Sequence, residues 1–91
     1  MKSRWTAMAD SELELKAGRT YRGKRPQNRN GLVNDRTILY IGATHIQYDG
    51  PVVGFGRHYP SCTREAFLKW AERDVTDELP KGEYAEWPIK N

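Results

Sequence analysis

The sequence has little cysteine and no long apolar run, and each absence excludes a class of protein. The single cysteine, Cys62, has no partner for an intrachain disulfide. A lone thiol is typical of a reducing compartment, so we expect a cytoplasmic protein. No apolar run approaches the ~20 residues needed to cross a bilayer, and residues 1–15 lack the apolar stretch of a secretory signal. We therefore expect no membrane association.

Signatures of metal binding and catalysis are also scarce. The soft metal ligands are limited to His45, His58 and Cys62, and a structural zinc site needs a fuller set. The best enzymatic arrangement pairs Cys62, near a predicted helix start, with His58 as its base, but no nucleophile signature surrounds PSCTRE. The stretch GFGRHY lacks the strand-to-helix continuation of a dinucleotide site. The sequence predicts a protein that is not an enzyme and has no metal or other cofactor.

The sequence does contain many aromatic residues and an uneven distribution of charge. Its 91 residues suit one small domain, which buries about 60–65% of the surface of the unfolded chain. Three tryptophans, five tyrosines and two phenylalanines are too many for a disordered chain. Residues 1–30 carry eight bases and three acids, whereas residues 31–91 carry seven bases and nine acids. The chain is basic early and acidic late.

Short extended segments follow one another along most of the chain. LKAGRTYRGKRP predicts a strand over residues 19–25, ended by Pro26, which has no N–H for a ladder. QNRNGLVND is rich in Asn and Gly and predicts a loop over residues 27–34. DRTILYIG and THIQYDG predict a hairpin, and the first of them is typical of a strand that is buried on both faces or strongly bent. VVGFGRHYP predicts one or two further strands.

One helix is predicted late in the chain, over residues 63–74. Phe67 and Trp70 recur there at helical spacing, and Ser61 or Thr63 is suited to cap the start. Residues 1–14 predict a loose arm, and residues 77–91 an acidic extended tail. Residues 15–76, with short strands and one late helix, predict a mainly β domain: a small SH3-like antiparallel β-barrel closed by a C-terminal α-helix.

The segments LKAGRTYRGK, DRTILYIG, IQYDGP and TREAFLKWA together resemble the small SH3-like accessory proteins of phages and prophages. The resemblance covers residues 15–75 and is one of pattern, without a diagnostic motif. Most such proteins have no known activity. The resemblance therefore implies an origin in a mobile element and no catalytic residue.

A basic stretch early in the chain is a candidate site for nucleic acid. Its members are Arg19, Arg22, Lys24, Arg25 and Arg29. If Tyr21 points into the core, strand alternation places Arg22 and Lys24 on the solvent face. Such a positive edge beside tyrosines would hold the backbone of DNA or RNA. Lys and Arg also commonly protect a sheet edge from pairing with another chain, so this explanation stays open.

Aromatic residues in peripheral segments favour a protein partner instead. The candidate interface consists of Trp5, Tyr21, Phe55, Tyr84, Trp87, Glu83 and Glu86. Large aromatic residues often anchor interfaces, and the two glutamates would either neutralise the basic strand or bind a basic partner. We expect a binding module, an accessory or inhibitor protein directed at a host complex or at a second copy of itself. Nucleic-acid binding is the alternative.

Overall fold

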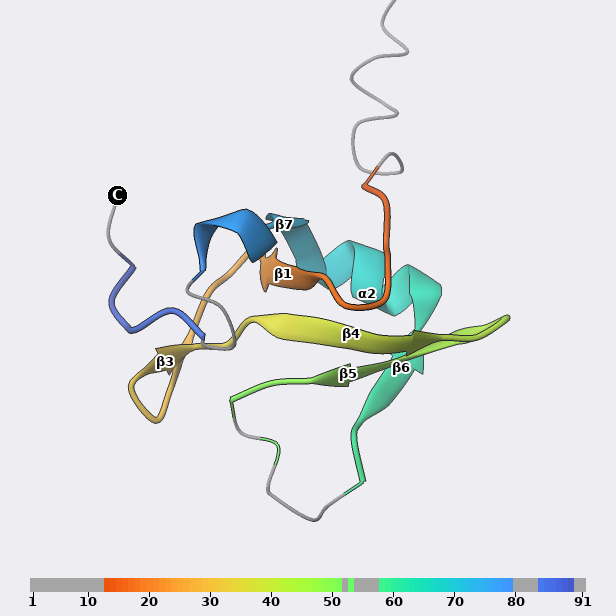
Figure 1. The fold of residues 1–91 in the computed structure, drawn as a ribbon, viewed down its shortest axis with the longest axis horizontal. Coiled ribbons are helices and arrows are strands. Elements are labelled where there is room, and N and C mark those ends of the chain that lie inside the picture. Colours follow the sequence, from red (N-terminus) through yellow and green to blue (C-terminus); the bar gives the residue numbers. More distant parts are fainter. Residues whose placement is uncertain (1–12, 52, 54–57, 80–83, 90–91) are drawn as a thin grey trace, which may run out of the picture.

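The computed structural model describes residues 13–51, 53, 58–79 and 84–89, in which short strands accompany one α-helix (Figure 1). The elements are β1 (Thr20–Gly23), β2 (Asn28–Arg29), β3 (Leu32–Val33), β4 (Arg36–Ile41), β5 (His45–Asp49), β6 (Ser61–Thr63), α2 (Arg64–Trp70), β7 (Ala71–Asp74) and the 3-10 turn η1 (Thr76–Glu78). The predicted mainly β chain with one helix is confirmed for these residues. The predicted arm, residues 1–14, and the strands predicted within residues 52–60 lie mostly outside them.

Five strands form one antiparallel sheet in the order β6-β5-β4-β1-β7. The predicted hairpin is confirmed as β4 and β5, in which Ile38 pairs with Tyr48 and Ile41 with Ile46. The register shifts between Ile38 and Tyr40, so Leu39 forms a bulge. The apolar run of β4 therefore belongs to a bent strand, in which Leu39 is 40% exposed and Tyr40 is 64% exposed.

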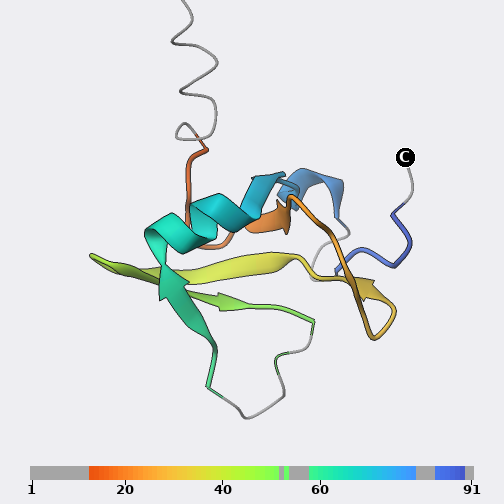
Figure 2. The same ribbon diagram turned by 180° about the vertical axis from the view of Figure 1, so that it is seen from behind.

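The sheet is not closed into a barrel, so the predicted SH3-like barrel is wrong. Within the described residues, the edge strands β6 and β7 do not pair with each other. Helix α2 follows directly on β6 and leads directly into β7, so it connects the two edges of an open sheet (Figure 2).

The helix lies in the middle of the chain and is shorter than predicted. It ends at Trp70, and Ala71 has extended backbone angles, φ −78° and ψ 137°. Residues 71–74 then pair with β1. Ala71 continues the helical spacing of apolar residues, but the hydrogen bonds that β1 offers stabilise a strand there.

The core lies between helix α2 and the sheet, and Phe67 is at its centre. The Phe67 ring meets the rings of Tyr21, Tyr48 and Trp70 edge to face, with centroids 5.6, 6.1 and 5.2 Å apart. The hydroxyl of Thr63 accepts a hydrogen bond from the N–H of Ala66 and so caps the helix, as predicted. The cap and the buried ring together fix how α2 sits on the sheet.

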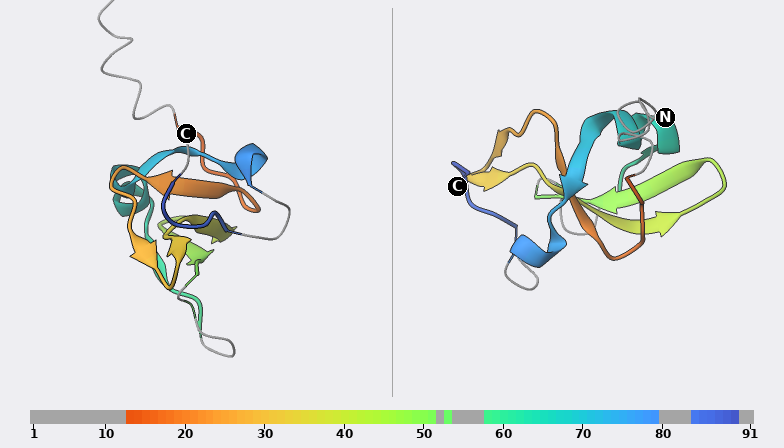
Figure 3. Two further views of the ribbon diagram at one scale, coloured as in Figure 1. Left: turned by 90° about the vertical axis from the view of Figure 1, so that its left-hand side faces the viewer. Right: turned by 90° about the horizontal axis from the view of Figure 1, so that it is seen from above.

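Residues 27–34, predicted as a loop, contain a second, two-stranded sheet. Strands β2 and β3 pair around Asn30 and Gly31, whose positive φ angles of 56° and 86° suit a tight hairpin turn. The C-terminal residues 84–89 lie along the other side of β3 (Figure 3). Part of the predicted extended tail thus lies against this hairpin, joined to it by one isolated β-bridge.

Gly23 is the one residue of β1 that must lack a side chain. A Cβ atom at Gly23 would lie 2.5 Å from Nε1 and 2.6 Å from Cε2 of Trp70. We expect Gly23→Ala to displace the indole and to lower the free energy of unfolding by about 1–3 kcal/mol. Urea unfolding followed by tryptophan fluorescence measures both effects. An unchanged unfolding midpoint would contradict this placement of Trp70.

Candidate functional site: a stacked arginine at an open pocket

Strands β4 and β5 and helix α2 bring together three side chains that are far apart in the sequence. The Cζ atom of Arg36 lies over the ring of Tyr48, 4.5 Å from its centroid, and over the ring of Trp70, 4.2 Å from its centroid. Both distances are within the range of cation–π attraction. Because Trp70 and Tyr48 also pack on buried Phe67, the rings that hold the guanidinium are themselves fixed.

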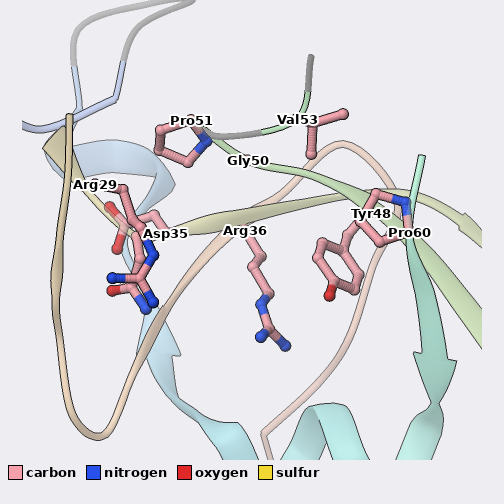
Figure 4. A pocket seen from close by; sticks show the side chains of 9 residues that line it. Arg29, Asp35, Arg36, Tyr48, Gly50, Pro51, Val53 and Pro60 are labelled. Atoms are coloured by element: carbon pink, nitrogen blue, oxygen red, sulfur yellow. The ribbon is translucent and has the colours of Figure 1, made fainter. Parts of the chain in front are cut away.

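Arg36 faces a pocket of about 220 Å³. Figure 4 shows Arg29 and Asp35 on one side of it, Tyr48 and Pro60 on the other, and Arg36 between them. The full lining is Arg29, Asn34, Asp35, Arg36, Tyr48, Gly50, Pro51, Val53 and Pro60. The pocket thus lies between the β2–β3 hairpin and the chain that follows β5.

A buried ion pair beneath the pocket neutralises Asp35, the one acidic residue of the lining in the part of the chain that the structure describes. Asp35 is fully buried and accepts two hydrogen bonds from Arg22, from Nε at 2.9 Å and from the second amino nitrogen at 3.0 Å. Among the described residues, no carboxylate forms an ion pair with Arg29 or Arg36. The lining is therefore net positive, and Arg36 is its most firmly positioned cation.

The predicted nucleic-acid residues are divided between the interior and the surface. Arg22 is only 7% exposed, so its predicted position on the solvent face is wrong. The physical reason is that β1 lies between β4 and β7 and is not an edge strand, and Asp35 gives the guanidinium a buried partner. Lys24, Arg25 and Arg29 are exposed, and Arg29 reaches the pocket.

Arg19, the remaining predicted cation, is engaged by acidic residues of its own chain. It donates to Asp74 at 2.8 Å and lies 3.5 Å from Asp77. Burial raises the pKa of Asp74, but hydrogen bonds from Arg19 and Thr76 outweigh this and hold the pKa below its usual value. Asp74 thus stays ionised and keeps Arg19 paired.

The predicted protein-interface residues also fall into different environments. Tyr21 is fully buried: its hydroxyl donates to the carbonyl of Glu14 and accepts from the N–H of Lys16. Tyr84 is half-buried, and burial raises its pKa. Trp87 is 37% exposed, and Glu86 is exposed. Trp5, Phe55 and Glu83 lie outside the described residues.

The structure gives no support to a nucleophile at Cys62. Cys62 lies in β6 and pairs with Ile46 of β5, and burial raises the pKa of its thiol, whereas an activated thiol has a lowered pKa. His58 and His45 are exposed, and the ring of His45 hydrogen-bonds Thr44. In the part of the chain that the structure describes, no three His, Cys, Asp or Glu side chains converge as metal ligands.

Comparisons of the chain with protein-family models, with curated proteins and with solved structures gave no match. The resemblance to accessory proteins of phages and prophages therefore stays a prediction. Within the described residues, no helix has both the length and the apolar character needed to span a membrane.

Sequence reasoning did not select Arg36, although a signal for it exists. Residues two apart in a strand share a face, so Arg36 lies on the same face as buried Ile38. A cation at such an inward position needs compensation, and an aromatic residue opposite is one source of it. Two-residue periodicity thus marks Arg36 as a residue with a special environment.

Proposed function

We propose that this protein is a non-enzymatic binding module that receives an acidic side chain of a partner protein at Arg36. The observation that carries the proposal is the guanidinium held over two fixed rings at an open, positive pocket. Stacking covers the faces of a guanidinium and leaves its N–H edge free, and that edge binds a carboxylate with two parallel hydrogen bonds. Because the side chain is already ordered, binding costs little further entropy.

The residue types around the pocket favour a protein over a nucleic acid. Trp, Tyr and Arg are the side chains that most often dominate binding energy at protein interfaces. Binding to a single strand needs aromatic faces on which bases stack, but Arg36 already covers the rings of Tyr48 and Trp70 on this side. Nucleic-acid binding remains the second candidate because Lys24, Arg25 and Arg29 are exposed and lie in one short stretch of the chain.

The proposal includes a cellular role that rests on the sequence. An accessory or inhibitor protein of a phage or prophage, acting in the cytoplasm on a host complex, agrees with the resemblance of residues 15–75 and with the single cysteine. A module that presents one positioned arginine suits a role in which binding itself is the activity.

We expect Arg36→Gln to weaken binding of a fluorescent glutamate-rich peptide by about 10- to 100-fold, because a charge-assisted hydrogen bond to carboxylate is lost. Arg36→Lys keeps the charge but loses the planar fork, so it should weaken binding by a smaller factor. Arg64→Gln is the matched control, since it removes the same charge from the exposed side of α2. Fluorescence anisotropy gives the three dissociation constants.

Two further ligands separate the candidate functions. A glutamine-rich peptide of the same length lacks the carboxylates and should not bind. Single-stranded oligothymidylate tests whether the protein binds a phosphate backbone. An equal loss of affinity for the glutamate-rich peptide in Arg36→Gln and Arg64→Gln would refute a specific role for the pocket. Tighter binding of the oligonucleotide, with a steep salt dependence that falls when Lys24 and Arg25 are replaced, would favour the nucleic-acid function instead.

A further inference from the structure

The C-terminal segment, residues 84–89, runs beside the β2–β3 hairpin and is joined to β3 by one isolated β-bridge (Figure 3). Glu86 lies opposite Leu32 in an antiparallel bridge. The N–H of Val33 donates to the carbonyl of Ala85 at 2.8 Å, and the N–H of Trp87 donates to the carbonyl of Gly31 at 2.9 Å. These hydrogen bonds join backbone groups, so they depend on the path of the segment more than on its side chains.

Among the described residues, the segment is joined to the rest of the protein by these two backbone hydrogen bonds and one side-chain contact. A hydroxyl contact of 3.2 Å joins Tyr84 to Thr37, while Glu86, Trp87 and Pro88 are exposed. No residue of the segment belongs to the core cluster around Phe67. Regions with few buried apolar contacts open at low free-energy cost, so the segment is able to leave while the five-stranded sheet stays folded.

Departure of the segment leaves β3 with an unsatisfied edge. Val33 is fully buried, and its N–H loses the acceptor on Ala85, while the carbonyl of Gly31 loses the donor on Trp87. An unpaired strand edge of this kind accepts another extended strand. The extended segment that fits this edge in the structure is residues 84–89, and a second copy of the chain carries the identical segment.

We propose that two copies of this protein exchange their C-terminal segments, each adding residues 84–89 to β3 of the other. The exchange reproduces every backbone hydrogen bond between chains and closes into a symmetric dimer. Within one chain the segment has the advantage of a high effective concentration, so the dimer forms as the protein concentration rises. This inference does not rest on the pocket, because it uses a different surface.

The full chain in a concentration series provides the test. Light scattering during gel filtration should show the mass rise from that of one chain to that of two. In a mixture of copies labelled with different isotopes, contacts between the Val33 N–H of one copy and Ala85 of the other should appear in NMR spectra. Trp87→Pro removes the N–H that reaches Gly31 and should leave a monomer, whereas Glu86→Ala changes only an exposed side chain and should dimerise normally.

Competition with a synthetic peptide makes the test decisive. Excess synthetic peptide of residues 84–89 should convert the dimer to monomers with bound peptide, and the same peptide methylated at the Trp87 nitrogen should not. A mass of one chain at every concentration would overturn the inference, as would a dimer that persists in Trp87→Pro or ignores the peptide. Arg36→Gln should dimerise like the unchanged protein, so failure of the pocket and failure of the exchange are distinguishable.

Discussion

Asp35→Ala is expected to lower the free energy of unfolding by about 3–5 kcal/mol, a large part of the stability of a small domain. Asp35 is fully buried and holds Arg22 through two hydrogen bonds, and Arg22 is itself nearly buried. Removing the carboxylate leaves a nearly buried guanidinium without the partner that compensates its charge. Urea unfolding followed by circular dichroism gives the free energy.

Two variants separate the ion pair from general damage. Replacing both partners by apolar residues, Arg22→Met with Asp35→Leu, removes the stranded charge, so this double variant should be about as stable as the unchanged protein or more stable. Glu78→Ala breaks the exposed pair of Glu78 with Arg73 and should hardly move the midpoint. If Asp35→Ala and Glu78→Ala have the same small effect, Arg22 is not buried as described.

Phe67→Ala is expected to lower the free energy of unfolding by about 3–5 kcal/mol, because it leaves a cavity between the sheet and helix α2 that repacking does not fill. Phe67 is the fully buried residue of α2, and its ring touches the rings of Tyr21, Tyr48 and Trp70. Two of these rings hold Arg36, so the loss should also weaken binding of the glutamate-rich peptide under conditions where the variant stays folded. Urea unfolding and fluorescence anisotropy measure the two effects.

Leu68 provides the comparison on the same helix. It is adjacent to Phe67 but only half-buried, so Leu68→Ala should destabilise less and leave peptide binding unchanged. Equal destabilisation by the two substitutions would mean that the helix packs through a different face. If Leu68→Ala loses peptide binding while Phe67→Ala keeps it, the core around Phe67 does not position Arg36.

Local chemistry made part of the fold predictable. Alternation in THIQYDG identified β5 and its hairpin with β4, and the hydroxyl of Thr63 identified the helix start, because both depend on residues close together in sequence. The end of the helix was not predictable in this way. Ala71 suits a helix by spacing, and it forms a strand because it meets Gly23, a residue far away along the chain.

Pairing between strands far apart in the sequence likewise determines which cationic side chains are buried and which are exposed. Arg22 belongs to a basic stretch, but β7 covers one side of β1 and β4 the other, and Asp35 lies within reach of its side chain. None of these partners follows from the composition of the stretch itself. The same holds for Arg36, whose two rings come from β5 and from the end of α2.

The position of β1 in the sheet has a consequence for synthesis on the ribosome. One neighbour, β4, is made soon after β1, but the other, β7, follows only after β5, β6 and α2. Pairing between such distant segments forms late, since the intervening chain must first be closed into a loop. Until residues 71–74 emerge, the nascent chain presents one side of β1 as an open edge, and this is the stage at which it most needs protection from aggregation.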